Sequence, residues 1–111
     1  MTIRRMTINE IAKEIHENAV AHGWWESDRP FGEVIALCHS ELSEALEAYR
    51  CGEDMVWDHD GKPDGIAVEM VDCVIRIFDA LESWGVDIED VLRMKHEFNK
   101  SREYKHGGKR I

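Results

Sequence analysis

The sequence predicts an all-α fold, a single domain of four helices that assembles into an oligomeric helical bundle. Apolar residues recur at the spacing of one helix face in four separate segments. Glycine, proline and clustered polar residues separate those segments. The chain has 111 residues, so we expect one domain over residues 1–111, with no internal repeat.

The first helix is predicted over residues 8–21. Thr7 is a suitable N-cap, and Glu10 stands three residues later, as in a capping box. Isoleucine and alanine residues at helical spacing form its apolar stripe, and Gly23 ends it. Residues 24–30, which begin with two adjacent tryptophans, are predicted to form a loop.

The second and third helices are predicted over residues 32–50 and 66–84. The second stops at Gly52, and Gly85 caps the end of the third. The segment between them, residues 53–65, is rich in aspartate and glycine and is predicted to be a polar loop.

The fourth helix is predicted from residue 87 or 88 to residue 104, and a polar tail follows it. Its main apolar residues are Val91, Leu92, Met94 and Phe98. Four helices of this length give a thin core in so short a chain. We therefore expect a homodimer or homotetramer that buries helix faces between subunits.

The composition narrows the class of protein. Lys and Arg number 14 and Asp and Glu number 23, and the resulting net charge of −9 argues against a nucleic-acid binder. Three cysteines without a Cys-x-x-Cys pair favour free thiols over a disulfide framework or a zinc site. No apolar run approaches the roughly 20 residues that span a bilayer, and the N-terminus lacks the apolar core of a signal peptide. We expect a cytoplasmic protein that binds neither nucleic acid nor membrane.

Two carboxylate pairs share one helical spacing. Glu41 and Glu44 lie on the second predicted helix, and Glu69 and Asp72 lie on the third. Each pair shares one helix face, so packing of the two helices would bring four carboxylates together. Such close like charges repel unless a cation lies between them, and Mg²⁺ prefers oxygen ligands of this kind. The pattern predicts that these four residues are the metal ligands and catalytic groups of an enzyme acting on a phosphate ester or anhydride. A solvated helix face is the alternative for either pair alone.

The fourth helix and the tryptophan loop offer complementary groups. Lys95, Asn99 and Arg102 recur on one helix face and are suitable donors to phosphate oxygens, although an ordinary surface stripe has the same pattern. Trp24 and Trp25 precede the metal-binding helix, and Trp25 is predicted to stack on a nucleotide base. The alternative for both indoles is that they pack the corner between the first two helices.

In this order, Glu41-x-x-Glu44, Glu69-x-x-Asp72 and Lys95-x-x-x-Asn99-x-x-Arg102 resemble the motifs of the MazG-like nucleoside triphosphate pyrophosphohydrolases, in the all-α NTP pyrophosphatase superfamily. The likeness runs from residue 23 to the C-terminus. It implies a helical fold that dimerises and Mg²⁺-dependent hydrolysis between the α and β phosphates, giving a nucleoside monophosphate and pyrophosphate. Mn²⁺ is expected to substitute for Mg²⁺.

The resemblance also implies roles for these residues. The four carboxylates would hold the metal, and Lys95, Asn99 and Arg102 would bind phosphates or help close the site. Many relatives carry a further glutamate before the first motif glutamate, where this chain has Ser40. Two alternatives remain, a phosphoribosyl-ATP pyrophosphohydrolase of the same superfamily and a non-catalytic helical oligomerisation or interaction module. Substrate profiling separates the two enzymes, and a metal titration separates both from the module.

Overall fold

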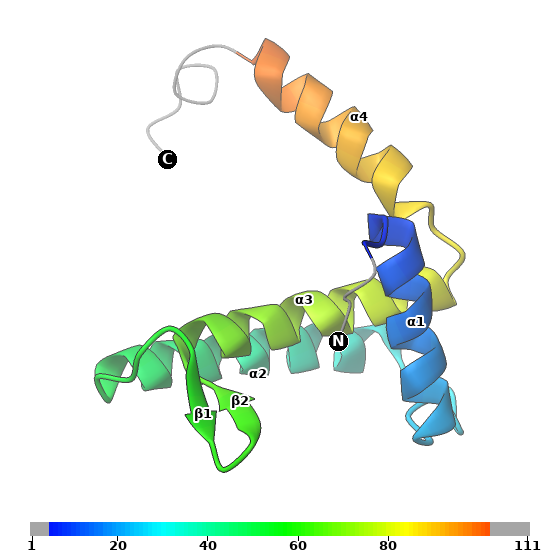
Figure 1. The fold of residues 1–111 in the computed structure, drawn as a ribbon. Helices are drawn as coiled ribbons and strands as arrows, with labels where there is room; N and C mark the ends of the chain where they lie inside the picture. Colours follow the sequence, from blue (N-terminus) through cyan, green and yellow to red (C-terminus); the bar gives the residue numbers. More distant parts are fainter. Residues whose placement is uncertain (1–4, 103–111) are drawn as a thin grey trace.

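The computed structural model describes residues 5–102, which form four helices and one small antiparallel hairpin (Figure 1). In chain order the elements are α1 (Ile8–Ala21), α2 (Phe31–Arg50), β1 (Trp57–His59), β2 (Lys62–Asp64), α3 (Ile66–Ser83) and α4 (Ile88–Ser101). The mostly helical character confirms the predicted class. The first three helices begin and end at the predicted positions or one residue away from them. The fourth helix begins at the predicted residue, but its predicted end at residue 104 is wrong, because the helix ends at Ser101 and Arg102 has an extended backbone.

The predicted start of α1 is confirmed in detail. The Thr7 side chain accepts a hydrogen bond from the Glu10 backbone N–H at 3.1 Å. In return, the Glu10 carboxylate accepts one from the Thr7 backbone N–H at 2.9 Å. This reciprocal capping box satisfies two N–H groups that a helix start otherwise leaves without partners.

The prediction of a plain loop over residues 53–65 is wrong, because this segment contains the β1–β2 hairpin. At its tip, Asp60 and Gly61 have φ angles of 51° and 88°, as a tight turn between twisted strands requires. The Trp57 indole N–H donates to Glu53 Oε1 at 2.9 Å. This bond links the first strand to the segment that leads into the hairpin. The register pairs Trp57 with Asp64, Asp58 with Pro63 and His59 with Lys62.

The hairpin is fixed to the first turn of α3. The Ile66 N–H donates to the Asp54 carbonyl at 3.1 Å, and the Ala67 N–H donates to the Met55 carbonyl at 2.9 Å. Gly65 immediately precedes these two donors and has a φ of 120°. A Cβ at Gly65 would lie 2.5 Å from the Met55 carbonyl oxygen, so only glycine fits there.

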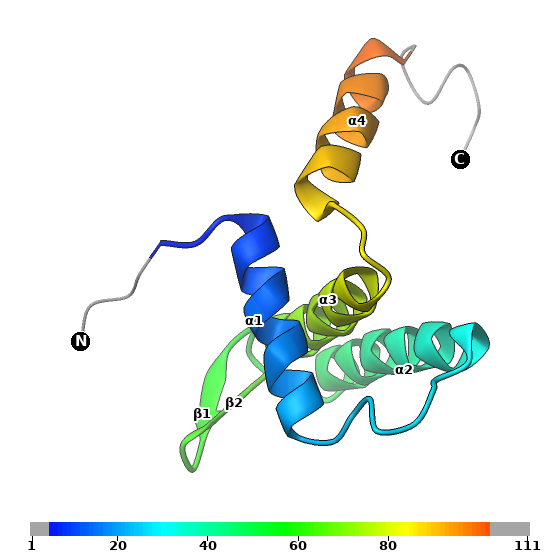
Figure 2. The same ribbon diagram turned by 90° about the vertical axis from the view of Figure 1, so that its right-hand side faces the viewer.

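The helices are arranged around the α2–α3 pair (Figure 1). α2 and α3 lie side by side and run in opposite directions, with α1 across one end of the pair and the hairpin toward the other. The start of α4 is tied to α1, because the Asn9 N–H donates to Glu89 Oε2 at 2.8 Å and the Glu89 N–H donates to Asn9 Oδ1 at 3.1 Å. The rest of α4 extends away from the other helices (Figure 2).

The buried core of one chain consists mainly of small side chains. Among the described residues, the buried apolar ones are Ala12, Val34, Cys38, Ala45, Ala48, Cys73, Ala80 and Ile88. Larger apolar side chains face outward, and Leu46 on α2 and Phe98 on α4 are 62% and 56% exposed. None of the helices in this part of the chain combines the length and apolar character needed to cross a membrane.

Candidate metal centre

Three of the predicted carboxylates converge where α2 faces the first half of α3. Glu41, Glu69 and Asp72 each offer one oxygen, and these oxygens lie within 4.8 Å of one another. Glu41 is only 7% exposed, while Glu69 and Asp72 are half-buried. Two ligands on opposite sides of Mg²⁺ lie about 4 Å apart, so small side-chain movements would bring these oxygens into coordination range.

The fourth predicted carboxylate, Glu44, lies at the exposed edge of this cluster. Hydrogen bonding to Glu41, together with partial burial, raises the pKa of the Glu44 carboxyl above its usual range. Glu44 also hydrogen-bonds with Glu69. The hydroxyl of the neighbouring Ser40 donates to the Leu37 carbonyl at 2.7 Å.

The electrostatics of the cluster fit a divalent cation. Burial raises the pKa of Glu69 to about 7, and hydrogen bonding and charge from Glu44 add to this effect. Burial and the charge of Glu41 also raise the pKa of Asp72. Without a cation the cluster therefore binds protons more readily than isolated carboxylates do. A hard divalent cation would replace those protons, and its preferred oxygen ligands are the donors present here.

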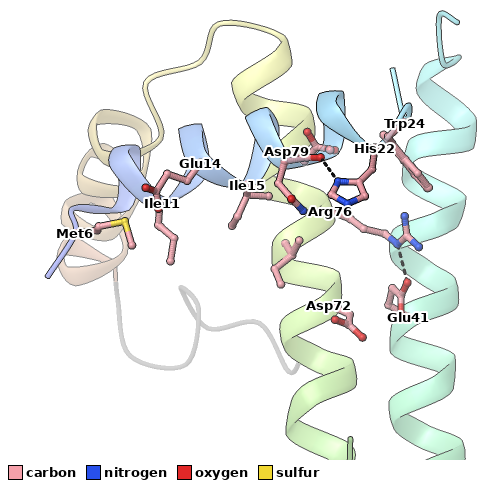
Figure 3. Close-up of a pocket in the computed structure, with 13 residues that line it drawn as sticks. Met6, Ile11, Glu14, Ile15, His22, Trp24, Glu41, Asp72, Arg76 and Asp79 are labelled. Carbon is pink, nitrogen blue, oxygen red and sulfur yellow. Dashed lines mark hydrogen bonds and ion pairs between the residues drawn. The ribbon is translucent and has the colours of Figure 1, made fainter. Parts of the chain in front are cut away.

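Arg76 belongs to this site and was missed from the sequence. Its Nε donates to Glu41 Oε1 at 2.6 Å, reaching from α3 to α2 (Figure 3). Arg76 lies four residues after Asp72, which places it one turn further along the same helix face. This spacing is the feature of the sequence that could have indicated its place in the site. Its guanidinium carbon also lies 4.7 Å from the centroid of the Trp24 ring.

A cavity of about 660 Å³ adjoins the carboxylates on the side of α1 (Figure 3). Glu41, Asp72 and Arg76 line it where it meets the cluster, and Trp24 lines it as well. The wall contributed by α1 is partly apolar and consists of Ile11, Glu14, Ile15, Asn18 and Ala19. The volume lies within the range of about 300–1,000 Å³ typical of small-molecule sites.

Trp25 does not line this cavity. Its indole N–H donates to both carboxylate oxygens of Asp79, at 2.9 and 3.1 Å, and His16 Nδ1 lies 2.7 Å from Asp79 Oδ1. These contacts join the tryptophan loop, α1 and α3, which agrees with the corner-packing alternative. Base stacking by Trp25 stays a prediction, and Trp24 is the indole that borders the cavity.

The predicted phosphate-binding residues of α4 do not reach the carboxylates within one chain. Lys95, Asn99 and Arg102 are exposed, and none of them lines the cavity. Lys95 Nζ and the Arg102 guanidinium carbon lie 4.8 and 6.0 Å from the centroid of the Phe98 ring. Their predicted role therefore requires an arrangement of α4 that a single chain does not provide.

The raised carboxyl pKa values predict how stability depends on pH. In the unfolded chain Glu69 titrates near 4.5, whereas in the folded metal-free protein its pKa is about 7. The folded state holds the proton more tightly, so the melting temperature should fall as pH rises from about 5 to 7.5. Mg²⁺ should raise the melting temperature more at pH 7.5 than at pH 5, because binding requires the deprotonated ligands. Scanning calorimetry with and without Mg²⁺ tests this, and Glu69→Gln should flatten the metal-free slope.

The arrangement as a whole suits a hard cation together with an anionic ligand. Carboxylate oxygens from two helices converge at one end of a cavity, and a guanidinium lies at their junction. Phosphate-bearing ligands are bound in proteins by this combination of a carboxylate-held cation and a fixed basic side chain. No family model matches this chain, and no match was found among curated proteins or solved structures.

Proposed function

We propose that this protein is a Mg²⁺-dependent nucleoside triphosphate pyrophosphohydrolase. The observation that carries the proposal is the convergence of Glu41, Glu69 and Asp72 within 4.8 Å, with Glu44 at the edge of the cluster. A non-catalytic interaction module would gain nothing from three carboxylates that repel one another at one point. Mg²⁺ is the expected ion, with Mn²⁺ as a substitute, because the donors are oxygens only.

The chemistry divides between the cation and the chain. Bound Mg²⁺ would neutralise charge on the triphosphate and make the attacking water more acidic. The chain's part is to hold the cation through Glu41, Glu69 and Asp72 and to accept a proton from water at one of the cluster carboxylates. The products would be a nucleoside monophosphate and pyrophosphate.

The cavity supports a nucleotide as the substrate. It adjoins Glu41 and Asp72, so a ligand whose phosphate meets the cation can extend its sugar and base along α1. Apolar side chains such as Ile11 and Ile15 offer contact area, while Asn18 offers hydrogen-bonding groups.

An oligomer is part of the proposal. The exposed apolar side chains of α2 and α3, including Leu42, Leu46 and Val71, leave surface that a second copy can cover. A homodimer or homotetramer would also allow α4 of one copy to approach the carboxylates of another. Lys95, Asn99 and Arg102 would then take their predicted places as phosphate ligands.

A pyrophosphate-release screen tests the proposed function directly. The purified protein is incubated with Mg²⁺ and each common or modified nucleoside triphosphate, and with phosphoribosyl-ATP. We expect equal amounts of monophosphate and pyrophosphate from at least one nucleoside triphosphate, and no products when a chelator is present. Release of mainly orthophosphate would contradict the assignment of the cleaved bond. Binding of Mg²⁺ without turnover of any compound would favour the interaction module.

A further inference from the structure

Arg76 is placed between the candidate metal centre and the cavity. Among the described residues that line the cavity, it is the only lysine or arginine, whereas Glu14, Glu41, Asp72 and Asp79 all bring carboxylates. The positive charge that neutralises a phosphate in this cavity must therefore come from a bound cation or from the guanidinium of Arg76. Its side chain is 29% exposed, so a ligand in the cavity can reach it.

The Arg76 guanidinium is held in position with donors to spare. Its Nε is occupied by Glu41 at 2.6 Å, and its flat face lies near the Trp24 ring. Within the described part of the chain, its two terminal nitrogens have no hydrogen-bond partner. A guanidinium offers five N–H donors in a rigid fork that matches phosphate oxygens, so four remain for a ligand.

The order of groups along α3 gives the site a direction. Glu69 comes first, next to the hairpin, and Asp72 and Arg76 follow at about 4.5 and 10.5 Å along the helix axis. The cavity touches Asp72 and Arg76 but not Glu69, so it lies on the Arg76 side of the cluster. A nucleoside in the cavity would then have its nearest phosphate beside Arg76.

The hairpin supplies a second basic group on the opposite side. Lys62 lies on β2, three residues before Gly65, whose tight packing fixes the hairpin against α3. β2 packs against α3, so Lys62 lies on the hairpin side of the carboxylate cluster. Lys62 is exposed and is therefore accessible to an anionic ligand.

We propose that Arg76 binds the α-phosphate and Lys62 binds the pyrophosphate portion of the nucleotide, so that the triphosphate lies along α3 with its nucleoside toward α1. The inference rests on the function proposed above and assigns each basic residue to one of the two products.

The two products separate the two roles. Calorimetry with the full chain and Mg²⁺ measures the dissociation constants of inorganic pyrophosphate and of dAMP, dCMP, dGMP and dTMP. Arg76→Gln should weaken the best-bound monophosphate about tenfold or more, while changing pyrophosphate binding less than about twofold. Lys62→Gln should weaken pyrophosphate binding about tenfold or more, while changing monophosphate binding less than about twofold. Arg50→Gln is the matched control, because Arg50 is an exposed arginine on α2 paired only with Glu47, and it should change neither constant.

Arg76→Lys is the conservative variant that separates weaker phosphate binding from loss of folding. It keeps a positive charge beside the buried Glu41 but lacks the fork, so it should melt as the wild type does and still bind the monophosphate several-fold more weakly. Mg²⁺ affinity measured without nucleotide should stay within about threefold of the wild type in this variant.

The outcomes distinguish this inference from the proposed function. Equal weakening of both products, or no weakening, in folded Arg76 variants would overturn the assignment of the α-phosphate. Weaker monophosphate binding in Lys62→Gln would overturn the direction. If the wild type neither cleaves a triphosphate nor binds either product, the proposed function itself fails.

Discussion

Asp72→Asn should reduce pyrophosphate release by about a hundredfold or more while leaving the helical content unchanged. The substitution keeps the shape of the side chain but removes the charge that completes the cluster with Glu41 and Glu69. Loss of a metal-binding charge removes several kcal/mol of stabilisation from the transition state, and each 1.4 kcal/mol is about tenfold in rate. Glu69→Gln should have a similar effect. Steady-state kinetics at saturating Mg²⁺, with circular dichroism as a check on folding, measure the loss.

Glu47→Gln is the matched control for these variants. Glu47 lies on α2 one turn beyond Glu44, but it is exposed and pairs only with its neighbours Arg50 and Cys51. Removing its charge should change the rate less than about twofold, as is usual for exposed ion pairs. Full activity of Asp72→Asn, or of the wild type in excess chelator, would rule out a metal held by this cluster.

Leu46→Glu should dissociate the proposed oligomer and unfold the separated chains. Leu46 is 62% exposed in one chain, and the neighbouring Leu42 and Tyr49 are exposed beside it. Burying such a side chain is worth about 1.5–3 kcal/mol, and a symmetric interface loses this amount from each copy in addition to burying a charge. Because the core of one chain consists mainly of alanine, cysteine and valine, we expect a free chain to bury too little apolar area to stay folded. Sedimentation and thermal melting measure both effects.

Leu46→Met is the matched control for Leu46→Glu. It changes the same helix position without removing the apolar contact. Methionine keeps the volume and the apolar character, so this variant should sediment and melt as the wild type does. A wild-type protein that sediments with the mass of one chain and melts cooperatively would show that α2 needs no partner. That result would contradict the proposed homodimer or homotetramer.

The helices and the carboxylate cluster could be predicted from local patterns. The capping box of Thr7 and Glu10 marks the start of α1, and the spacing of three residues places Glu69 and Asp72 on one face of α3. These signals depend only on the periodicity of a helix and on the hydrogen bonds at its ends. Convergence of the two pairs follows once α2 and α3 pack together, which their apolar stripes also favour.

The parts that escaped prediction depend on contacts between distant residues. Asp60-Gly61 is a hairpin signal, but the flanking strands are three residues long and lack alternating apolar residues, so local periodicity does not indicate them. Arg76 acquires its role only through Glu41, which lies 35 residues away. The direction in which α4 leaves the domain is likewise set by its contacts with α1 and not by its own periodicity.

The junction at Gly65 has a consequence for the length of the segment between α2 and α3. Each residue of an α-helix turns the chain by about 100°, so the starting point of α3 sets the rotational phase of every side chain after it. The hairpin fixes that starting point through the Asp54 and Met55 carbonyls. A single residue inserted between Gly65 and Glu69 would rotate the Glu69 and Asp72 side chains away from α2. Surface loops usually tolerate insertions, but this junction sets the rotational phase of α3, so one added residue would disperse the carboxylate cluster.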